Sequence, residues 1–105
     1  MIIEFEKDYL SDLYYNGQTN NSKLWFQPAV VKKYIKTVDL LESLSRIEDL
    51  YRYNSLNYEA LSGDMKGLES VRVTEKYRLE FISRKEGEKD CITVCKLIDL
   101  SNHYQ

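Results

Sequence analysis

Apolar and polar residues follow a helical period in the first half of the chain. After a β-prone start at Ile2–Phe5, apolar residues recur at helical spacing over residues 7–15, and Gly17 ends that segment. A longer apolar stripe covers residues 29–44 behind Pro28, whose missing N–H costs nothing in the first turn of a helix. The pattern therefore predicts a short strand followed by two amphipathic helices.

A further short helical turn is predicted after the second helix. Ser45 and Glu48 fit the capping-box pattern, in which each side chain bonds the backbone N–H of the other residue. Residues 52–59, rich in Tyr and Asn, are predicted to form a loop.

From Glu69 onward the period of the pattern changes to two, which predicts antiparallel strands. With residues 74–76 as the hairpin loop, Arg72 lies opposite Arg78. Like charges in directly opposite positions destabilise a sheet. We therefore expect either that Glu69 or Glu80 neutralises the two arginines or that the pair holds an anion.

The C-terminal part of the pattern predicts a meander. Residues 84–89 are expected to form a solvated turn, and residues 90–100 a third strand in the interior of the sheet, with its facing left open. The predicted fold class is α+β: a short N-terminal strand, two helices packed on one face of an antiparallel sheet, and a C-terminal three-stranded meander. Residues 1–105 are expected to form a single domain.

Composition narrows the classes of function. Hydrophobic residues make up 43% of the 105 residues and charged residues 30%, as in ordinary globular domains. Lys and Arg number 15 against 17 Asp and Glu, so bulk charge does not hold this chain on nucleic acid, and any RNA site must be a local patch. There is no apolar run of membrane-spanning length, and the acidic, mixed N-terminus is unlike a signal peptide, so a cytoplasmic location is expected.

The two cysteines predict neither a disulfide nor a metal site. On one strand, Cys91 and Cys95 would lie about 13 Å apart, beyond the reach of a disulfide. His103 is the only histidine, so a metal site lacks ligands. Both cysteines are expected to be buried or half-buried structural thiols.

One stretch, residues 61–81, has a specific pattern. It contains Gly63-Asp64, Gly67, Ser70-Val71-Arg72, Tyr77-Arg78 and a closing Phe81. This pattern resembles the central motif of HigB-type toxins, which belong to the RelE/ParE superfamily of toxin–antitoxin ribonucleases. The resemblance implies a RelE-like fold, cleavage of messenger RNA, commonly on the ribosome, and neutralisation by a HigA-like helix-turn-helix antitoxin.

The resemblance also implies which residues carry the chemistry. RNA supplies its own nucleophile, the 2′-OH, so cleavage needs no cofactor or metal. Arg72 and Arg78 are the predicted phosphate clamp, because a guanidinium matches phosphate bidentately. His103 is the predicted proton-transfer group, with an unperturbed pKa of about 6.5, assisted by Tyr104 or Glu59. Relatives tend to carry an aromatic residue and a histidine directly after the position of Asp99, whereas His103 and Tyr104 come slightly later. Many relatives also have a histidine where this chain has Glu59.

Three further residues are predicted to bind RNA: Lys66, Lys76 and Tyr58. Two other interpretations stay open: that the arginines simply pair with carboxylates, and that the nine tyrosines of the chain only cover the edges of a small core. The second candidate function is accordingly a binding module of the same fold, with little activity, that mainly engages an antitoxin.

Overall fold

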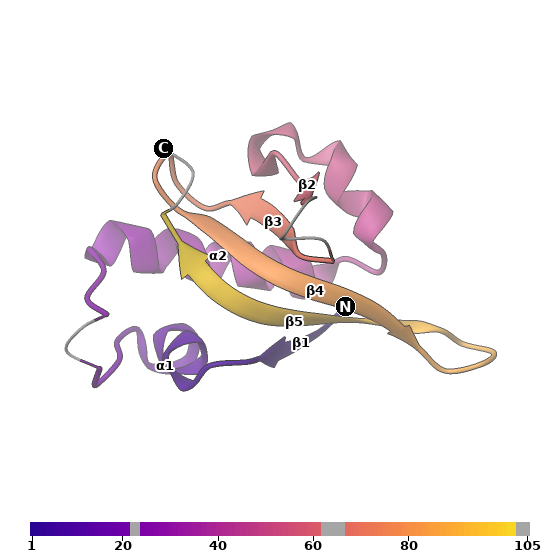
Figure 1. Ribbon diagram of the computed structural model, residues 1–105, viewed down its shortest axis with the longest axis horizontal. Helices are drawn as coiled ribbons and strands as arrows, with labels where there is room; N and C mark the ends of the chain where they lie inside the picture. The colour runs from indigo at the N-terminus through magenta and orange to yellow at the C-terminus, as the bar shows by residue number, and fades with distance from the viewer. Residues whose placement is uncertain (22–23, 62–66, 103–105) are drawn as a thin grey trace.

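The computed structural model describes residues 1–21, 24–61 and 67–102, and these form a mixed five-stranded sheet with helices against it (Figure 1). The strand order is β1-β5-β4-β3-β2, in which β1 runs parallel to β5 and the other neighbours are antiparallel. The strands are β1 (Ile2–Phe5), β2 (Glu59–Ala60), β3 (Glu69–Arg72), β4 (Arg78–Glu86) and β5 (Ile92–Ser101). This confirms the predicted α+β class and the interior position of the last strand.

The helices begin and end close to where the sequence predicts. They are α1 (Asp8–Asn16), α2 (Pro28–Ser43) and two 3-10 helices, η1 (Ile47–Arg52) and η2 (Asn54–Leu56). Gly17 closes α1 with a left-handed backbone, φ 74°, and its N–H donates to the carbonyl of Leu13. No helix in the described part of the chain is long and apolar enough to cross a membrane.

The capping residues of η1 differ from the prediction by one position. The Asp49 carboxylate, rather than that of Glu48, accepts the N–H of Arg46 at 3.2 Å. Arg52 also donates to Asp49 at 2.8 Å. The N-cap of η1 is Arg46, so Ser45 lies one residue before the cap. Asp49, three residues after Arg46, is therefore the side chain that bonds back to the cap.

The core lies between the helices and one face of the sheet. Leu10 and Leu13 of α1 pack together with the buried side of α2, and the Tyr34 hydroxyl donates to the carbonyl of Leu10 at 2.7 Å. Figure 1 shows α2 lying along the rear of the sheet. From the strands, Leu79 and Phe81 are fully buried in the same cluster. The opposite face of the sheet carries charged side chains such as Glu4, Arg84 and Lys96.

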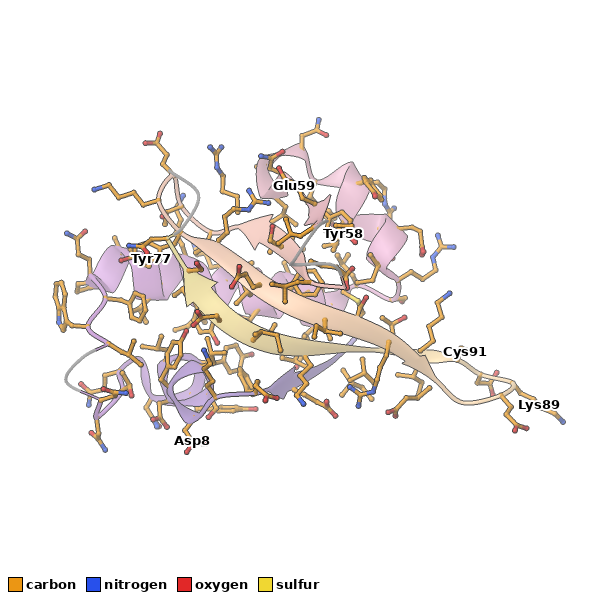
Figure 2. The ribbon with its side chains drawn as sticks, viewed as in Figure 1. Asp8, Tyr58, Glu59, Tyr77, Lys89 and Cys91 are labelled. Atoms are coloured by element: carbon orange, nitrogen blue, oxygen red, sulfur yellow. The ribbon has the colours of Figure 1, made fainter. Side chains whose placement is uncertain are left out.

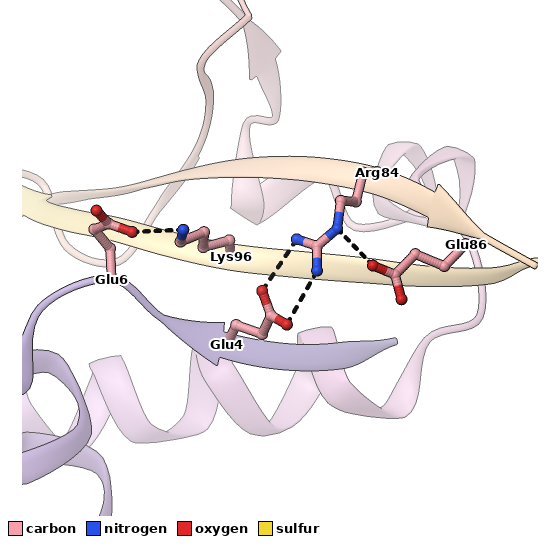
Figure 3. A network of polar contacts seen from close by, with 5 residues as sticks. All are labelled: Glu4, Glu6, Arg84, Glu86 and Lys96. Atoms are coloured by element: carbon pink, nitrogen blue, oxygen red, sulfur yellow. Dashed lines mark hydrogen bonds and ion pairs between the residues drawn. The ribbon is translucent and has the colours of Figure 1, made fainter.

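The hairpin between β4 and β5 is longer than predicted. β4 continues to Glu86, through the first half of the segment expected to be a turn, and the hairpin projects from the body of the molecule (Figure 1). The guanidinium of Arg84 donates to both oxygens of Glu4, each at 3.0 Å, and to Glu86 at 2.9 Å (Figure 3). These ion pairs cross the outer face of the sheet, where Lys96 also pairs with Glu6 at 2.7 Å. Side chains that look solvated in the sequence thus form ion pairs across the sheet, and the pair between Glu4 of β1 and Arg84 of β4 spans the intervening strand β5.

One of the two cysteine predictions is wrong. Cys95 is fully buried in β5, as expected, but Cys91 precedes the strand and is exposed. Both thiols are free. Cys91 lies in the tight turn after β4, where its Sγ donates to the Gly87 carbonyl at 3.2 Å instead of packing in the core.

The segment predicted as a loop at residues 52–59 is partly regular. It contains η2 and the first residue of β2, whose Glu59 and Ala60 pair with Ser70 and Glu69. Asn57 connects the two elements with a left-handed backbone, φ 45°. A strand of only two residues shows no periodicity in the sequence. It forms because it pairs with β3, whose residues follow later in the chain.

Candidate functional site

The strand registers bring three of the predicted site residues to one face of the sheet. Arg72 of β3 lies opposite Arg78 of β4, as predicted, and Glu59 of β2 lies opposite Ser70 of β3. Arg78 in turn lies opposite Ser101 at the end of β5. Directly opposite residues share a face, and residues two apart on a strand share it too. We call this surface the arginine face, formed by Glu59, Ser70, Arg72, Arg78, Glu80, Asp99 and Ser101.

The guanidinium of Arg78 is fixed by hydrogen bonds to neighbouring residues of the protein. Its side chain is only 7% exposed, and its Nε donates to Ser70 Oγ at 3.0 Å. One terminal nitrogen of its guanidinium donates to the carbonyl of Asn57. Arg72, by contrast, is exposed. The two opposed arginines therefore differ in environment: one guanidinium is fixed within the sheet, and the other reaches solvent.

The structure separates the two carboxylates proposed to neutralise the arginines. Glu69 lies opposite Phe81, on the helix-covered face, so its proposed role beside the arginines is wrong. Its carboxylate instead accepts bonds from the backbone N–H and hydroxyl of Ser83, at 2.8 and 2.6 Å. Glu80 lies on the arginine face, two residues from Arg78, and is 4% exposed. Glu80 is therefore the carboxylate whose position fits charge compensation.

Tyr58 is tied into the same region by packing. Its hydroxyl donates to Glu69 at 2.6 Å, and its ring contacts Tyr51 and Phe81 with centroid separations of 5.2 and 6.3 Å. Burial, and then the bond to Glu69, raise the pKa of Tyr58. Figure 2 shows Tyr58 close to Glu59, below the two 3-10 helices. These contacts are those of a residue that covers the edge of the core, and its predicted RNA binding stays a prediction.

The end of β5 is fastened by Tyr9 of α1. The Tyr9 hydroxyl donates to the Asp99 carboxylate and accepts the N–H of Leu100 at 2.8 Å. Lys7 lies 3.4 Å from the same carboxylate. Burial, and then the bond to Asp99, raise the pKa of Tyr9. Because β1 ends at Phe5, this tyrosine replaces a strand partner along the last residues of β5.

The remaining predicted residues divide into two groups. Lys76 is exposed in the β3–β4 turn, where the Thr74 hydroxyl accepts the N–H groups of Lys76 and Tyr77 at 3.2 and 3.1 Å. His103, Tyr104 and Lys66 lie outside the described residues. Within the part of the chain that the structure describes, no group of three or more His, Cys, Asp or Glu could hold a metal ion.

The sequence analysis missed the partners of Arg78. Ser70 lies two residues before Arg72 in the same strand, so the alternation of side chains places both on one face. This alternation could have identified Ser70 as a neighbour of the arginines. Asn57 contributes a backbone carbonyl at the end of a 3-10 helix, which no side-chain pattern marks. The pattern of apolar residues likewise gave no signal that Trp25 is 73% exposed.

Comparison with solved structures fits this architecture. The YoeB/ParE toxin from Agrobacterium tumefaciens superimposes with a TM-score of 0.56 at 20% identity, over 99% of this chain and 100% of that one. The chain shares the fold of the YoeB-type toxins. The YoeB–YefM complex from Staphylococcus aureus gives a TM-score of 0.54 at 23% identity, over 99% of this chain and 98% of the matched chain. Neither the protein-family models nor the curated proteins compared with the sequence gave a match.

Proposed function

We propose that the protein is the toxin of a type II toxin–antitoxin system and acts as a metal-independent endoribonuclease on messenger RNA in the cytoplasm. The observation that carries the proposal is the arginine face. Within a YoeB-like fold, this face joins Arg72, Arg78 and Glu59 to Ser101, the last residue of β5. In the sequence His103 follows Ser101 by two residues, a length of chain that spans about 7 Å at most.

The chemistry assigned to this face is transfer of the RNA phosphate to the neighbouring 2′-OH. The 2′-oxygen bonds to phosphorus as the bond to the 5′-oxygen breaks, which leaves a 2′,3′-cyclic phosphate and a free 5′-OH. Arg72, the exposed arginine, contacts the phosphate oxygens, and the fixed charge of Arg78 stabilises the negative charge that develops there. His103 transfers protons, with Glu59 or Tyr104 as the second acid–base group.

The proposed partners follow from the motif and the fold together. One matched structure is named as a complex of YoeB with YefM, which supports a toxin neutralised by direct binding of an antitoxin. The resemblance of residues 61–81 to HigB toxins supports a HigA-like helix-turn-helix antitoxin and messenger RNA held on the ribosome as the substrate.

The test is transcript-end mapping after brief induction of the wild-type chain, Arg72→Ala and His103→Ala, with Lys85→Ala on the projecting hairpin as the matched control. We expect new 5′ ends inside reading frames for the wild type and Lys85→Ala, and their loss with Arg72→Ala and His103→Ala. Retention of the new ends with His103→Ala would move proton transfer to Glu59 and Tyr104. An absence of new ends from folded wild-type protein would overturn the ribonuclease.

A second candidate function is a binding module of the same fold that engages an antitoxin without cutting RNA. The burial of Arg78 favours it, because a guanidinium bonded to Ser70 and Asn57 has a structural role without any substrate. Antitoxin binding together with no new transcript ends would support this alternative.

A further inference from the structure

The side chain of Trp25 points into solvent, whereas that of the next residue, Phe26, packs into the protein. Phe26 turns into the molecule, where its ring lies 5.4 Å from that of Tyr77 and 6.2 Å from that of Tyr9. The segment before α2 is thereby anchored against the β3–β4 turn. Trp25 itself is 73% exposed, although burying an indole would gain more free energy than burying almost any other side chain.

Trp25 stands at one end of a groove between α2 and the β3–β4 turn. A hollow of about 520 Å³ is lined by Trp25, Lys33 and the turn residues Thr74 and Glu75. A second hollow, of about 470 Å³, shares Lys33, Thr74 and Glu75 with the first and extends to Arg72. The two hollows adjoin through these shared residues. We call the combined depression the Trp25 groove.

The Trp25 groove is basic, although the whole chain carries a net charge of −2. Its lining includes the four cations Lys33, Lys36, Arg72 and Lys76, against the single carboxylate of Glu75. None of these four cations forms an ion pair with another residue of the described ranges. This is the local basic patch that an RNA-binding protein of acidic composition requires.

We propose that the Trp25 groove binds a single-stranded segment of RNA that continues beyond the scissile phosphate. The proposal rests on the function proposed above, because Arg72 belongs both to the arginine face and to the lining of the groove. Lys33, Lys36 and Lys76 contact successive phosphates. A base stacks on the exposed indole of Trp25, as bases of single strands stack on aromatic side chains beside cations.

The combination of groups favours RNA over an acidic peptide. A peptide rich in Asp and Glu would need only the lysines and would leave the flat face of Trp25 unused. A single strand offers phosphates and π-faces at regular spacing along one chain, which matches cations followed by an indole. An acidic protein segment is therefore the competing occupant in the test.

The chain contains one tryptophan, so its fluorescence reports directly on the groove. The probe is a short single-stranded 2′-O-methyl RNA of mixed sequence, which lacks the attacking 2′-OH and is not cleaved. We expect its titration to quench the fluorescence of Trp25. By anisotropy of the same labelled RNA, Trp25→Ala should weaken binding about 5- to 150-fold.

The lysines are tested by a charge-matched pair of double variants. Lys33→Ala with Lys76→Ala should weaken RNA binding at least about tenfold and reduce the slope of log K against log salt by about 0.7 per lost phosphate contact. Lys85→Ala with Lys89→Ala removes the same charge from the projecting hairpin, where Figure 2 shows Lys89 at the end of the molecule opposite Tyr77. This control should bind like the wild type.

The outcomes separate this proposal from the proposed function. If the wild type cleaves transcripts while the groove variants bind RNA unchanged and Trp25 is not quenched, the groove assignment is overturned and the ribonuclease stands. If the wild type neither cleaves nor binds, both are overturned. If polyglutamate quenches Trp25 and the RNA does not, the groove belongs to a protein partner and the RNA proposal is wrong.

Discussion

Arg78 donates a hydrogen bond from Nε to Ser70 Oγ at 3.0 Å, across the junction of β4 and β3. Together with its bond to the Asn57 carbonyl, this contact draws the guanidinium toward oxygen atoms on one side. Arg72, directly opposite in register, extends into solvent. Two arginines that would repel each other in an ideal ladder are thus placed in different environments, which gives them separable effects on stability and activity.

Arg78→Ala should lower the free energy of unfolding by about 2–3 kcal/mol, because it leaves the buried Ser70 hydroxyl and the part-buried Asn57 carbonyl without their donor. Arg72→Ala should change it by no more than about 0.5 kcal/mol, as expected for an exposed side chain. Urea unfolding followed by circular dichroism measures both values. Equal losses for the two variants would contradict the assignment of Arg78 as the fixed arginine.

Tyr9→Phe should lower the free energy of unfolding by about 1–2 kcal/mol, since the hydroxyl bonds both Asp99 and the N–H of Leu100 at the end of β5. The matched control is Tyr15→Phe, which removes a hydroxyl from a side chain that is 72% exposed. Hydrogen exchange of the Leu100 amide should also accelerate in Tyr9→Phe alone. Unchanged exchange at this amide would show that Tyr9 does not fasten the strand.

The two cysteines should differ in reactivity. Burial raises the pKa of Cys95 to about 12, so its thiolate does not form in the folded protein at ordinary alkaline pH. Native protein at pH 8 should therefore react once with a thiol reagent such as DTNB, at exposed Cys91, and twice after unfolding. Cys91→Ser should abolish the native reaction, whereas fast modification of that variant would contradict the burial of Cys95.

The raised pKa of Cys95 also predicts how the stability of the protein changes with pH. In the unfolded chain the thiol ionises near its ordinary pKa of about 8.5. The folded state keeps its proton until about pH 12. The unfolded state therefore binds fewer protons in this range, and the contribution of Cys95 to stability, complete below pH 8.5, should fall as the pH rises. Cys95→Ala should flatten this part of the stability profile.

The Glu4–Arg84 pair should contribute to stability only above acidic pH. The hydrogen bonds from Arg84 lower the pKa of Glu4 below its ordinary value. A lowered folded-state pKa adds stability above the unfolded pKa, and this is lost as the pH falls through the folded value. The difference in unfolding free energy between wild type and Glu4→Gln should thus shrink below about pH 4. Glu88→Gln, in the exposed β4–β5 turn, is the control, because it removes the same charge from a residue that forms no ion pair within the described ranges.

Local pattern predicted most of the elements in this chain. The apolar spacing of α2, with Pro28 in its first turn, and the left-handed Gly17 after α1 belong to interactions within a few residues, so they can be detected without tertiary contacts. The alternation in β3 and β4 likewise placed Arg72 opposite Arg78, because a short hairpin has few possible registers. The predicted capping residue Glu48 was wrong by one position, since Asp49 competes for the same N–H groups.

Tertiary structure alone decided how the candidate site is assembled. The burial of Arg78 depends on Asn57 and Ser70, and the support for the end of β5 depends on Tyr9, ninety residues from Asp99 in the chain. The basic character of the Trp25 groove arises because α2 packs beside the β3–β4 turn. The α+β elements and the opposed arginines follow from local periodicity, so the amino-acid pattern was enough to predict them. Only the packed structure determined which arginine is fixed and which cations gather around Trp25, because those relationships join segments that are distant in sequence.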